Sequence, residues 1–254
     1  MKIVLIGSGN VATVLARLIK STEHTIVEVE SKQLQHAQTL ANELNVNAIT
    51  NIDVITKDAD IYIICVSDDA IENIVKQLYV KNKIVVHTSG TVSKNVLQNS
   101  SDNFGVLYPL QSLRKELSYI PDIPFLIDGN SSEIIRTIET FVNSFSKKVY
   151  PANDEERLKL HVAAVIVSNF TNHLYALAKD YCKKENTDFS LLVPLIKEVA
   201  LRTENYDPEN MQTGPAFRND AITISKHLEI LSVHPNLQKI YSQLTESIQS
   251  YYQL

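Results

Sequence analysis

A long apolar stretch, LKLHVAAVIVSNFTNHLYALA at residues 158–178, contains several side chains that could do chemistry. It has no Gly or Pro, and it therefore predicts a buried helix. His161, Ser168 and Asn172 are spaced at i, i+7 and i+11, so an α-helix would align them in one narrow stripe, with Asn169 to one side. Each unpaired buried polar group costs roughly 1–3 kcal/mol, so the stripe should face a pocket. The alternative is a core histidine and amides that are satisfied within the fold.

The types of these side chains suggest how they would divide a reaction between them. Histidine titrates near neutral pH, so we expect His161 to donate or accept a proton. Ser168 and Asn169 are expected to orient the substrate, and Asn172 to contact it. His161, Ser168 and Asn169 are thus the predicted catalytic residues.

A second unusual segment, MQTGPAFRND at residues 211–220, contains a turn at Thr213 and Gly214 that should begin a helix. Arg218 and Asp220 would then lie in its first turn. A cation is unfavourable at a helix N-terminus unless an anion pairs with it. Arginine is a planar bidentate donor, so we expect Arg218 to bind a carboxylate or phosphate of the substrate. Substrate contacts are also expected at Thr213, Gly214 and Asp220. The alternative is a surface turn with a local Arg218–Asp220 pair.

The chain opens with an apolar strand at residues 2–6, a glycine turn and a helical pattern. The turn has the form G-x-G-x-x-A, which in this context predicts a site for a dinucleotide. The first Gly permits the tight turn, the second lets the backbone approach a pyrophosphate, and the Ala keeps the helix close to the strand. The helix N-terminus would supply N–H donors to the phosphates. The expected cofactor contacts are Gly7, Ser8, Gly9, Asn10, Val11 and Ala12. A glycine turn that binds nothing is the alternative.

The end of the second strand bears on the choice between NAD and NADP. Glu30 lies where an acidic residue would bind the ribose 2′-hydroxyl of NAD. Ser31 and Lys32 follow at once, and a hydroxyl and a cation suit a 2′-phosphate. We favour NADP over NAD, because Glu30 could point away along the strand.

Polar residues also follow three other strands, and ligands bind at the carboxyl ends of parallel strands. Val66 and Ser67 are expected to contact the cofactor, although Ser67 could instead cap the next helix. The segment at 87–90 combines a histidine, two hydroxyls and a glycine, an unusual composition for a simple turn. The cofactor is expected at Thr88, Ser89 and Gly90, and the substrate at His87 and Gln111.

The elements that must position these residues follow from hydrophobic periodicity. Apolar runs alternate with helical patterns up to about residue 150, which predicts crossover units and a parallel sheet, and only helical patterns follow. We therefore predict an α/β Rossmann-like dinucleotide-binding domain at 1–152 and an all-helical domain for the substrate and dimerisation at 153–254. The expected strands are 2–6, 25–30, 47–50, 59–67, 83–89, 104–110, 124–129 and 147–151. The expected helices are 11–20, 33–45, 70–79, 131–146, 154–185, 189–205, 217–232 and 236–252.

Composition narrows the class of protein. The 254 residues have a formal net charge of −5 and no basic block, so nucleic acid is not an expected partner. No apolar span reaches the roughly 20 residues that cross a membrane, and MKIVLIGSGN does not resemble a signal peptide, so we expect a cytoplasmic protein without membrane contact. Cys65 and Cys182 lack metal-ligand spacing and are expected to be free thiols, and no metal is expected.

Five motifs in a fixed order resemble an uncharacterised bacterial family. They are GSGNVA, HTSG at 87–90, YPLQS at 108–112, LHVAAVIVSN at 160–169 and TGPAFRND at 213–220. That family pairs a Rossmann-like NADP-binding domain with a helical C-terminal domain of unknown function, and its members are labelled NADP-dependent oxidoreductases. The resemblance spans essentially the whole chain, so it implies the same fold and cofactor.

The layout is also similar to pyrroline-5-carboxylate reductase and the β-hydroxyacid dehydrogenases. In those proteins a helical second domain closes over the nicotinamide and often builds a dimer, which implies a homodimer here. The family often has His-Pro-Leu-Gln at the position of residues 108–111, whereas this chain begins that motif with Tyr108. The family often has Arg-Gly-Asp at the position of residues 218–220, whereas the middle residue of this chain is Asn219. The lysine that the β-hydroxyacid dehydrogenases use on the corresponding helix is absent, so their mechanism is not implied.

The sequence thus predicts an NADP-dependent oxidoreductase. It would transfer hydride to or from a small polar carbonyl or imine, in a cleft between its two domains. A non-catalytic NADP-binding sensor or scaffold would keep the glycine turn and use the polar stripe as an interface. The fold similarity also leaves open a reductase with a deazaflavin as second cofactor.

Overall fold

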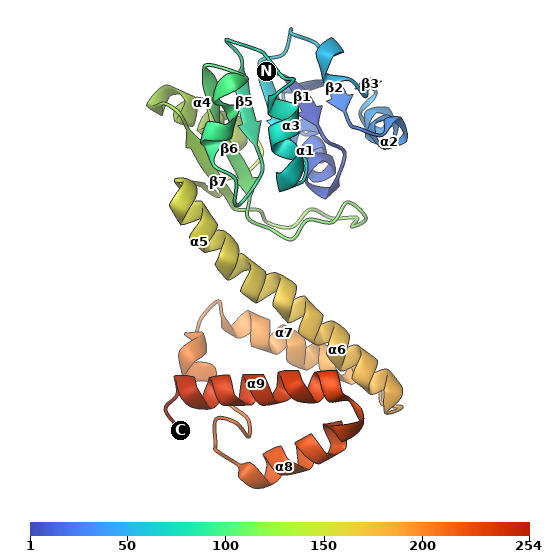
Figure 1. Cartoon of the computed structure of the whole chain (residues 1–254), viewed down its shortest axis with the longest axis vertical. Helices are drawn as coiled ribbons and strands as arrows, with labels where there is room; N and C mark the ends of the chain where they lie inside the picture. Colours follow the sequence, from blue (N-terminus) through green and yellow to red (C-terminus); the bar gives the residue numbers. More distant parts are fainter. The chain divides into compact units, whose positions relative to one another are not determined.

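The computed structural model describes residues 1–254, which form two compact units, Met1–Asn169 and Phe170–Leu254. Figure 1 shows strands in the first unit and helices alone in the second. The predicted fold class, a Rossmann-like sheet domain followed by helices, is confirmed. The two compact units meet between Asn169 and Phe170, inside a helix. The predicted domain boundary at 152/153 follows the last strand and stays a prediction.

An eight-stranded sheet forms the centre of the first unit, in the order β3-β2-β1-β4-β5-β6-β7-β8. All neighbouring strands are parallel except β6 and β7, so the expectation of a parallel sheet fails at this one pair. A loop and no crossover helix joins these two strands, and such a connection reverses the chain direction. The strands are β1 (Lys2–Ile6), β2 (Thr25–Glu30), β3 (Asn47–Ile49), β4 (Ile61–Ile64), β5 (Ile84–His87), β6 (Asn103–Pro109), β7 (Phe125–Gly129) and β8 (Val149–Pro151).

Helices cover both faces of the sheet because its central strands are apolar on both sides. In β1, Ile3 and Leu5 pack with α1 (Asn10–Lys20), α2 (Leu34–Leu44) and α4 (Ser132–Asn143). The alternate residues Val4 and Ile6 pack on the opposite face, where α3 (Asp68–Val75) contributes two buried side chains. This alternation with a period of two residues is what a doubly covered parallel sheet requires. The carboxyl ends of β1 and β4 therefore meet where the direction of winding reverses.

The stretch predicted as one buried helix differs from that expectation in two ways. Residues 158–178 cover the latter part of α5 (Asp154–Ala164), a π-helical turn (Val165–Phe170) and the first part of α6 (Thr171–Lys184). Val167 is 71% exposed and Phe170 is 59% exposed, so the prediction of burial is wrong for the chain by itself. A π-helix turns each residue through less than the 100° of an α-helix, so the narrow stripe deduced from α-helical spacing does not continue through this turn.

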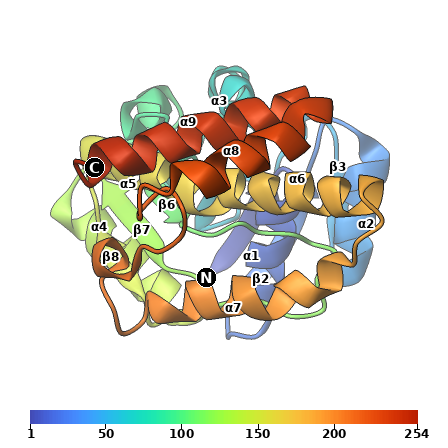
Figure 2. The ribbon, with the colours of Figure 1, turned by 90° about the horizontal axis from the view of Figure 1, so that it is seen from below.

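The helical unit has very little core of its own. It comprises α6 from Thr171 on, α7 (Val193–Arg202), α8 (Ala221–Ile230) and α9 (Pro235–Tyr251). Only three of its apolar residues are buried: Cys182, Ala216 and Leu231. Figure 2 shows α8 beside α9, with α7 well separated from both. None of the helices of the chain combines the length and the apolar character needed to cross a membrane.

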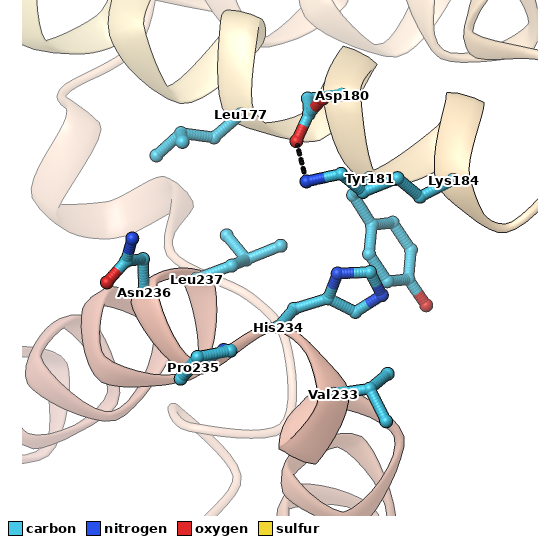
Figure 3. A pocket seen from close by; sticks show the side chains of 9 residues that line it. All are labelled: Leu177, Asp180, Tyr181, Lys184, Val233, His234, Pro235, Asn236 and Leu237. Atoms are coloured by element: carbon cyan, nitrogen blue, oxygen red, sulfur yellow. Dashed lines mark ion pairs between the residues drawn. The ribbon is translucent and has the colours of Figure 1, made fainter.

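Polar and aromatic contacts join the end of α6 to the start of α9. A hollow of about 190 Å³ lies between these two segments, and Figure 3 shows the side chains that line it. His234 Nε2 lies 2.7 Å from Glu185 Oε1, and its ring meets Tyr181 edge-on with the centroids 5.2 Å apart. Asp180 and Lys184 form an ion pair at 2.7 Å on the other side of the hollow. These groups satisfy one another, so they serve as structural links between the helices.

Candidate active site

A cavity of about 820 Å³ lies at the carboxyl ends of the central strands in the first unit. The glycine turn lines it together with the ends of β2 and β4 and one side of α3. Open parallel sheets bind their ligands at such a reversal of strand order. Of the predicted cofactor residues, the cavity is lined by Gly7, Ser8, Gly9, Ser31, Lys32, Val66 and Ser67.

The glycine turn has the shape that a pyrophosphate requires. Gly7 has φ +114°, and a Cβ added there would lie 2.3 Å from the carbonyl oxygen of Cys65, so only glycine fits. A Cβ added at Gly9 would meet nothing within 4 Å, so the space beside it is open. No side chain caps the start of α1, and its first N–H groups remain available to an anion. The residues present therefore fit a dinucleotide.

The end of β2 brings Glu30, Ser31 and Lys32 to the same cavity. The preference for NADP assumed that Glu30 points away along the strand. Glu30 instead lines the cavity, so this reason for the preference does not hold. Its side chain is buried, and this burial raises the pKa of its carboxyl group, so the uncharged form is favoured relative to an exposed glutamate. The hydroxyl of Ser8 donates to that of Ser31 at 2.9 Å and links the turn to this strand end.

A second group of side chains gathers beside β5 and β6. The hydroxyl of Tyr108 lies 2.8 Å from Nδ1 of His161, and the two rings meet edge-on. Burial raises the pKa of Tyr108, so its hydroxyl stays protonated at neutral pH and can donate to the imidazole. The sequence motif YPLQS marked this strand end, but it gave no sign that Tyr108 would be the partner of His161.

Gly90 makes this contact possible. A Cβ added at Gly90 would lie 2.5 Å from Nδ1 of His161 and 3.1 Å from Cζ of Tyr108. Gly90, which was predicted to contact the cofactor, lies directly against the Tyr108–His161 pair and does not line the large cavity. Its lack of a side chain leaves the space that the imidazole occupies.

We expect Gly90→Ala to displace the imidazole of His161 and to break its hydrogen bond with Tyr108. The variant should lose about 1–3 kcal/mol of stability, as overpacked sites do. Long-range ¹H–¹⁵N spectra of the histidine rings would show the change as a shift of the His161 signals, which are identified by their absence in His161→Gln. Unchanged His161 signals in Gly90→Ala would contradict this arrangement.

His87 and Arg157 are both fully buried and interact electrostatically with each other. His87 is fully buried, and burial together with the Arg157 charge lowers its pKa to about 4, so it is neutral at neutral pH. Its Nδ1 accepts from the Ser89 N–H at 3.2 Å, and its Nε2 has no protein partner. Arg157 donates through Nη2 to the Val92 carbonyl at 2.6 Å and to Asp154 at 2.8 Å. Sequence reasoning missed this buried arginine, because nothing in its neighbourhood distinguishes it from a solvated residue.

Several predicted residues bond to the protein around them. The Thr88 hydroxyl donates to the Ile64 carbonyl at 3.3 Å. The Ser89 hydroxyl accepts from the N–H groups of Thr91 and Val92 at 3.1 and 3.0 Å. The Gln111 amide donates to the Asp122 carbonyl at 2.9 Å. These bonds hold the loops at the strand ends, and neither Thr88 nor Ser89 lines the large cavity.

The remaining predicted residues lie along or beyond the π-helical turn. Ser168 is partly buried within this turn, and Asn169 and Asn172 are exposed. In the helical unit, Gly214 has φ +104° and Asp220 caps α8 by accepting from the Thr223 N–H at 3.0 Å. The helix begins at Ala221, so the prediction that Arg218 and Asp220 lie in its first turn is wrong: Asp220 is the N-cap and Arg218 precedes it. Thr213 and Arg218 are both exposed, and the buried Ala216 lies between them in the sequence.

Comparison with known proteins gives matches to both parts of the chain. Residues 2–90 match the family model described as "NADP oxidoreductase coenzyme F420-dependent", and residues 123–248 match the "Domain of unknown function (DUF2520)". The chain is 36% identical to the putative NADP oxidoreductase BF3122 from Bacteroides fragilis, over 98% of both chains, with a TM-score of 0.90. No curated protein matches the sequence.

Two more distant structures show the same fold. A pyrroline-5-carboxylate reductase from Streptococcus pyogenes is 15% identical, with 98% of each chain covered and a TM-score of 0.66. An imine reductase from Myxococcus stipitatus in complex with NADP+ is 14% identical, with 98% of this chain and 93% of that chain covered, and also has a TM-score of 0.66. The resemblance deduced from the five motifs is thereby confirmed. The chain belongs to a family of NADP oxidoreductases. In this family the domain described as "NADP oxidoreductase coenzyme F420-dependent" is followed by a DUF2520 domain.

Proposed function

We propose that the protein is an NADP-dependent oxidoreductase that transfers hydride to or from a small polar carbonyl or imine. The observation that carries this proposal is the open cradle at the glycine turn, with Gly7 in a conformation reserved for glycine and free space beside Gly9. Such a cradle at an uncapped helix N-terminus suits a pyrophosphate. The description of the Bacteroides fragilis relative as an NADP oxidoreductase supports the same class of cofactor.

The residues that would hold the cofactor divide into two groups. The N–H groups from Gly9 to Ala12 would bind the pyrophosphate, and Ser31 and Lys32 would bind the 2′-phosphate of NADP. Val66 and Ser67 line the same cavity farther along its wall, beside α3. When bound, the nicotinamide supplies or accepts the hydride.

His161 is the proposed proton donor and acceptor. Transfer of hydride to a C=O or C=N bond needs a proton within hydrogen-bond reach. Because Tyr108 engages Nδ1 of His161, Nε2 is the ring nitrogen left to exchange a proton with the substrate. Tyr108 can donate to or accept from Nδ1, so it can hold the ring in either protonation state. We propose Ser168 and Asn169 as the groups that orient the substrate, and Arg218 as the group that binds its carboxylate or phosphate.

Thermal unfolding with separate titrations of NADP, NADPH, NAD and NADH tests the cofactor. We expect NADP and NADPH to stabilise the protein by roughly 2.7 kcal/mol at 100 times the dissociation constant, with much smaller effects of NAD and NADH. Lys32→Glu should remove most of this preference, because it reverses the charge proposed to bind the 2′-phosphate. Equal effects of the two pairs would refute the preference for NADP, and no effect of any nucleotide would refute the proposed function.

We further propose that the helical unit pairs with a second copy of the chain. Only three of its apolar residues are buried, and many of its large apolar side chains are at least a third exposed. Monomeric proteins rarely expose apolar surface on this scale. A unit that cannot bury its own apolar faces needs a partner that presents the same kind of surface, and an identical helical unit does so. The exposed apolar residues include Leu174, Leu191, Leu195, Val199, Leu201, Ile222, Ile230 and Leu244.

The compartment proposed for the protein is the cytoplasm. Cys65 and Cys182 are both buried free thiols, one in each compact unit. Free cysteines are the common state of proteins in a reducing compartment.

A further inference from the structure

The loop at residues 110–124, which joins β6 to β7, is fastened to the first helix of the sheet domain. The Lys115 N–H donates to Oδ1 of Asn10 at 3.2 Å, and Arg17 donates through Nη1 to the Lys115 carbonyl at 2.8 Å. Glu43 pairs with the same arginine at 2.7 Å and so restrains it. In Figure 1 this loop runs past the carboxyl ends of the strands toward α1 and α2. The backbone of Lys115 is therefore held beside the first residue of α1.

Lys115 lines the same large cavity as the glycine turn, although it follows the turn by about a hundred residues. Lys32 and His36 also line this cavity, and its one carboxyl group is the buried Glu30. No carboxylate forms an ion pair with the ammonium group of Lys115, and the first turn of α1 has no acidic residue. The adjacent Glu116 carboxylate interacts electrostatically with Lys115, but its ion pair is with Arg114. A cation beside a helix N-terminus, in a cavity with a single carboxyl group, suits a phosphate ligand.

We propose that Lys115 binds a phosphate group of the dinucleotide and that the 110–124 loop is the third element of the cofactor site. This inference rests on the proposed cofactor binding and adds a residue that none of the sequence motifs indicates. The phosphate is either in the pyrophosphate, close to Asn10, or the 2′-phosphate, close to Lys32. The two sources offer the same chemistry, and the experiment below separates them.

The experiment compares Lys115→Ala with the adjacent control Arg114→Ala by isothermal titration calorimetry with NADP+ and NAD+. Arg114 is exposed, pairs with Glu116, and does not line the cavity, so the two variants lose the same charge one residue apart. We expect Lys115→Ala to weaken NADP+ binding about tenfold, the factor that 1.4 kcal/mol represents. Arg114→Ala should change it less than about twofold, as expected for an exposed charge away from the ligand. Lys115→Arg should restore most of the affinity.

The two nucleotides identify the phosphate. An equal loss for NADP+ and NAD+ would assign Lys115 to the pyrophosphate, and a loss for NADP+ alone would assign it to the 2′-phosphate. The loop bonds use the backbone of Lys115, so its side-chain variants should keep the wild-type unfolding temperature, measured in the absence of nucleotide. Wild-type affinity in Lys115→Ala would overturn this proposal alone. Failure of the wild-type protein to bind either nucleotide would overturn the proposed function as well.

Discussion

His161→Gln is expected to lower turnover by about two orders of magnitude or more while NADP affinity stays unchanged. General acid–base catalysis by a positioned side chain contributes a factor of about 10²–10⁴, and glutamine cannot exchange a proton in this way. His161 does not line the large cavity, so its replacement should leave cofactor binding intact. Steady-state kinetics with NADPH and a carbonyl or imine substrate found by screening would give the first quantity, and calorimetry the second.

His173→Gln is the matched control for this prediction. His173 lies in α6, within the same apolar stretch, and its side chain is exposed. The control should keep both turnover and affinity. Tyr108→Phe should cause an intermediate loss of turnover, because it keeps the ring beside His161 and removes the hydroxyl that holds Nδ1. A parallel loss of turnover and NADP affinity in His161→Gln would argue for a structural role of His161 and against the proposed catalytic one.

The second large effect is expected from the double variant Leu195→Glu/Val199→Glu. These residues lie four positions apart on α7 and therefore on one face, and they are 58% and 56% exposed in the single chain. If that face packs against a second copy, two buried carboxylates should raise the dissociation constant of the dimer by about a hundredfold or more. Light scattering after gel filtration should give twice the chain mass for the wild type and the mass of a single chain for the variant.

Val54→Glu provides a control for the general effect of an added charge. Val54 is 65% exposed, but it lies in the sheet domain, so this variant should remain a dimer. The unfolding temperature of the wild type should also rise with protein concentration, because dissociation precedes or accompanies unfolding. A wild type that stays monomeric at micromolar concentrations would refute the proposed pairing.

Local patterns were sufficient to predict most of the fold. The apolar runs around Ile3 and Ile63 and the glycine turn at Gly7 follow from short-range rules, and the structure has strands and a cofactor-sized cavity there. The reversal at β7 was not predictable, because an apolar run does not state the direction in which it pairs. The exposed 158–178 helix was mispredicted for a related reason. Its composition indicates that it needs burial, but not which surface provides it.

The candidate site shows a similar limit. Gly90 and His161 were selected separately, from a strand end and from a helix, and the structure brings them together. Tyr108 was noted only as a departure from the family, and its hydrogen bond to His161 depends on a contact across 53 residues. Lys115 belongs to a loop without a motif, and its position follows from bonds made by its backbone. Tertiary contacts of this kind leave no local signature in the sequence.

The two buried cysteines allow the opening of each compact unit to be timed separately. Burial raises the pKa of Cys65 to about 12, so this thiol forms almost no thiolate while the sheet domain is closed. Cys182 is buried in the helical unit, and no other cysteine is present. Each thiol is more than nine-tenths covered by its surroundings, so an alkylating reagent should react with it faster when the surrounding structure opens. Each compact unit thus carries one thiol, and a change in the labelling rate of either thiol reports on the opening of its own unit.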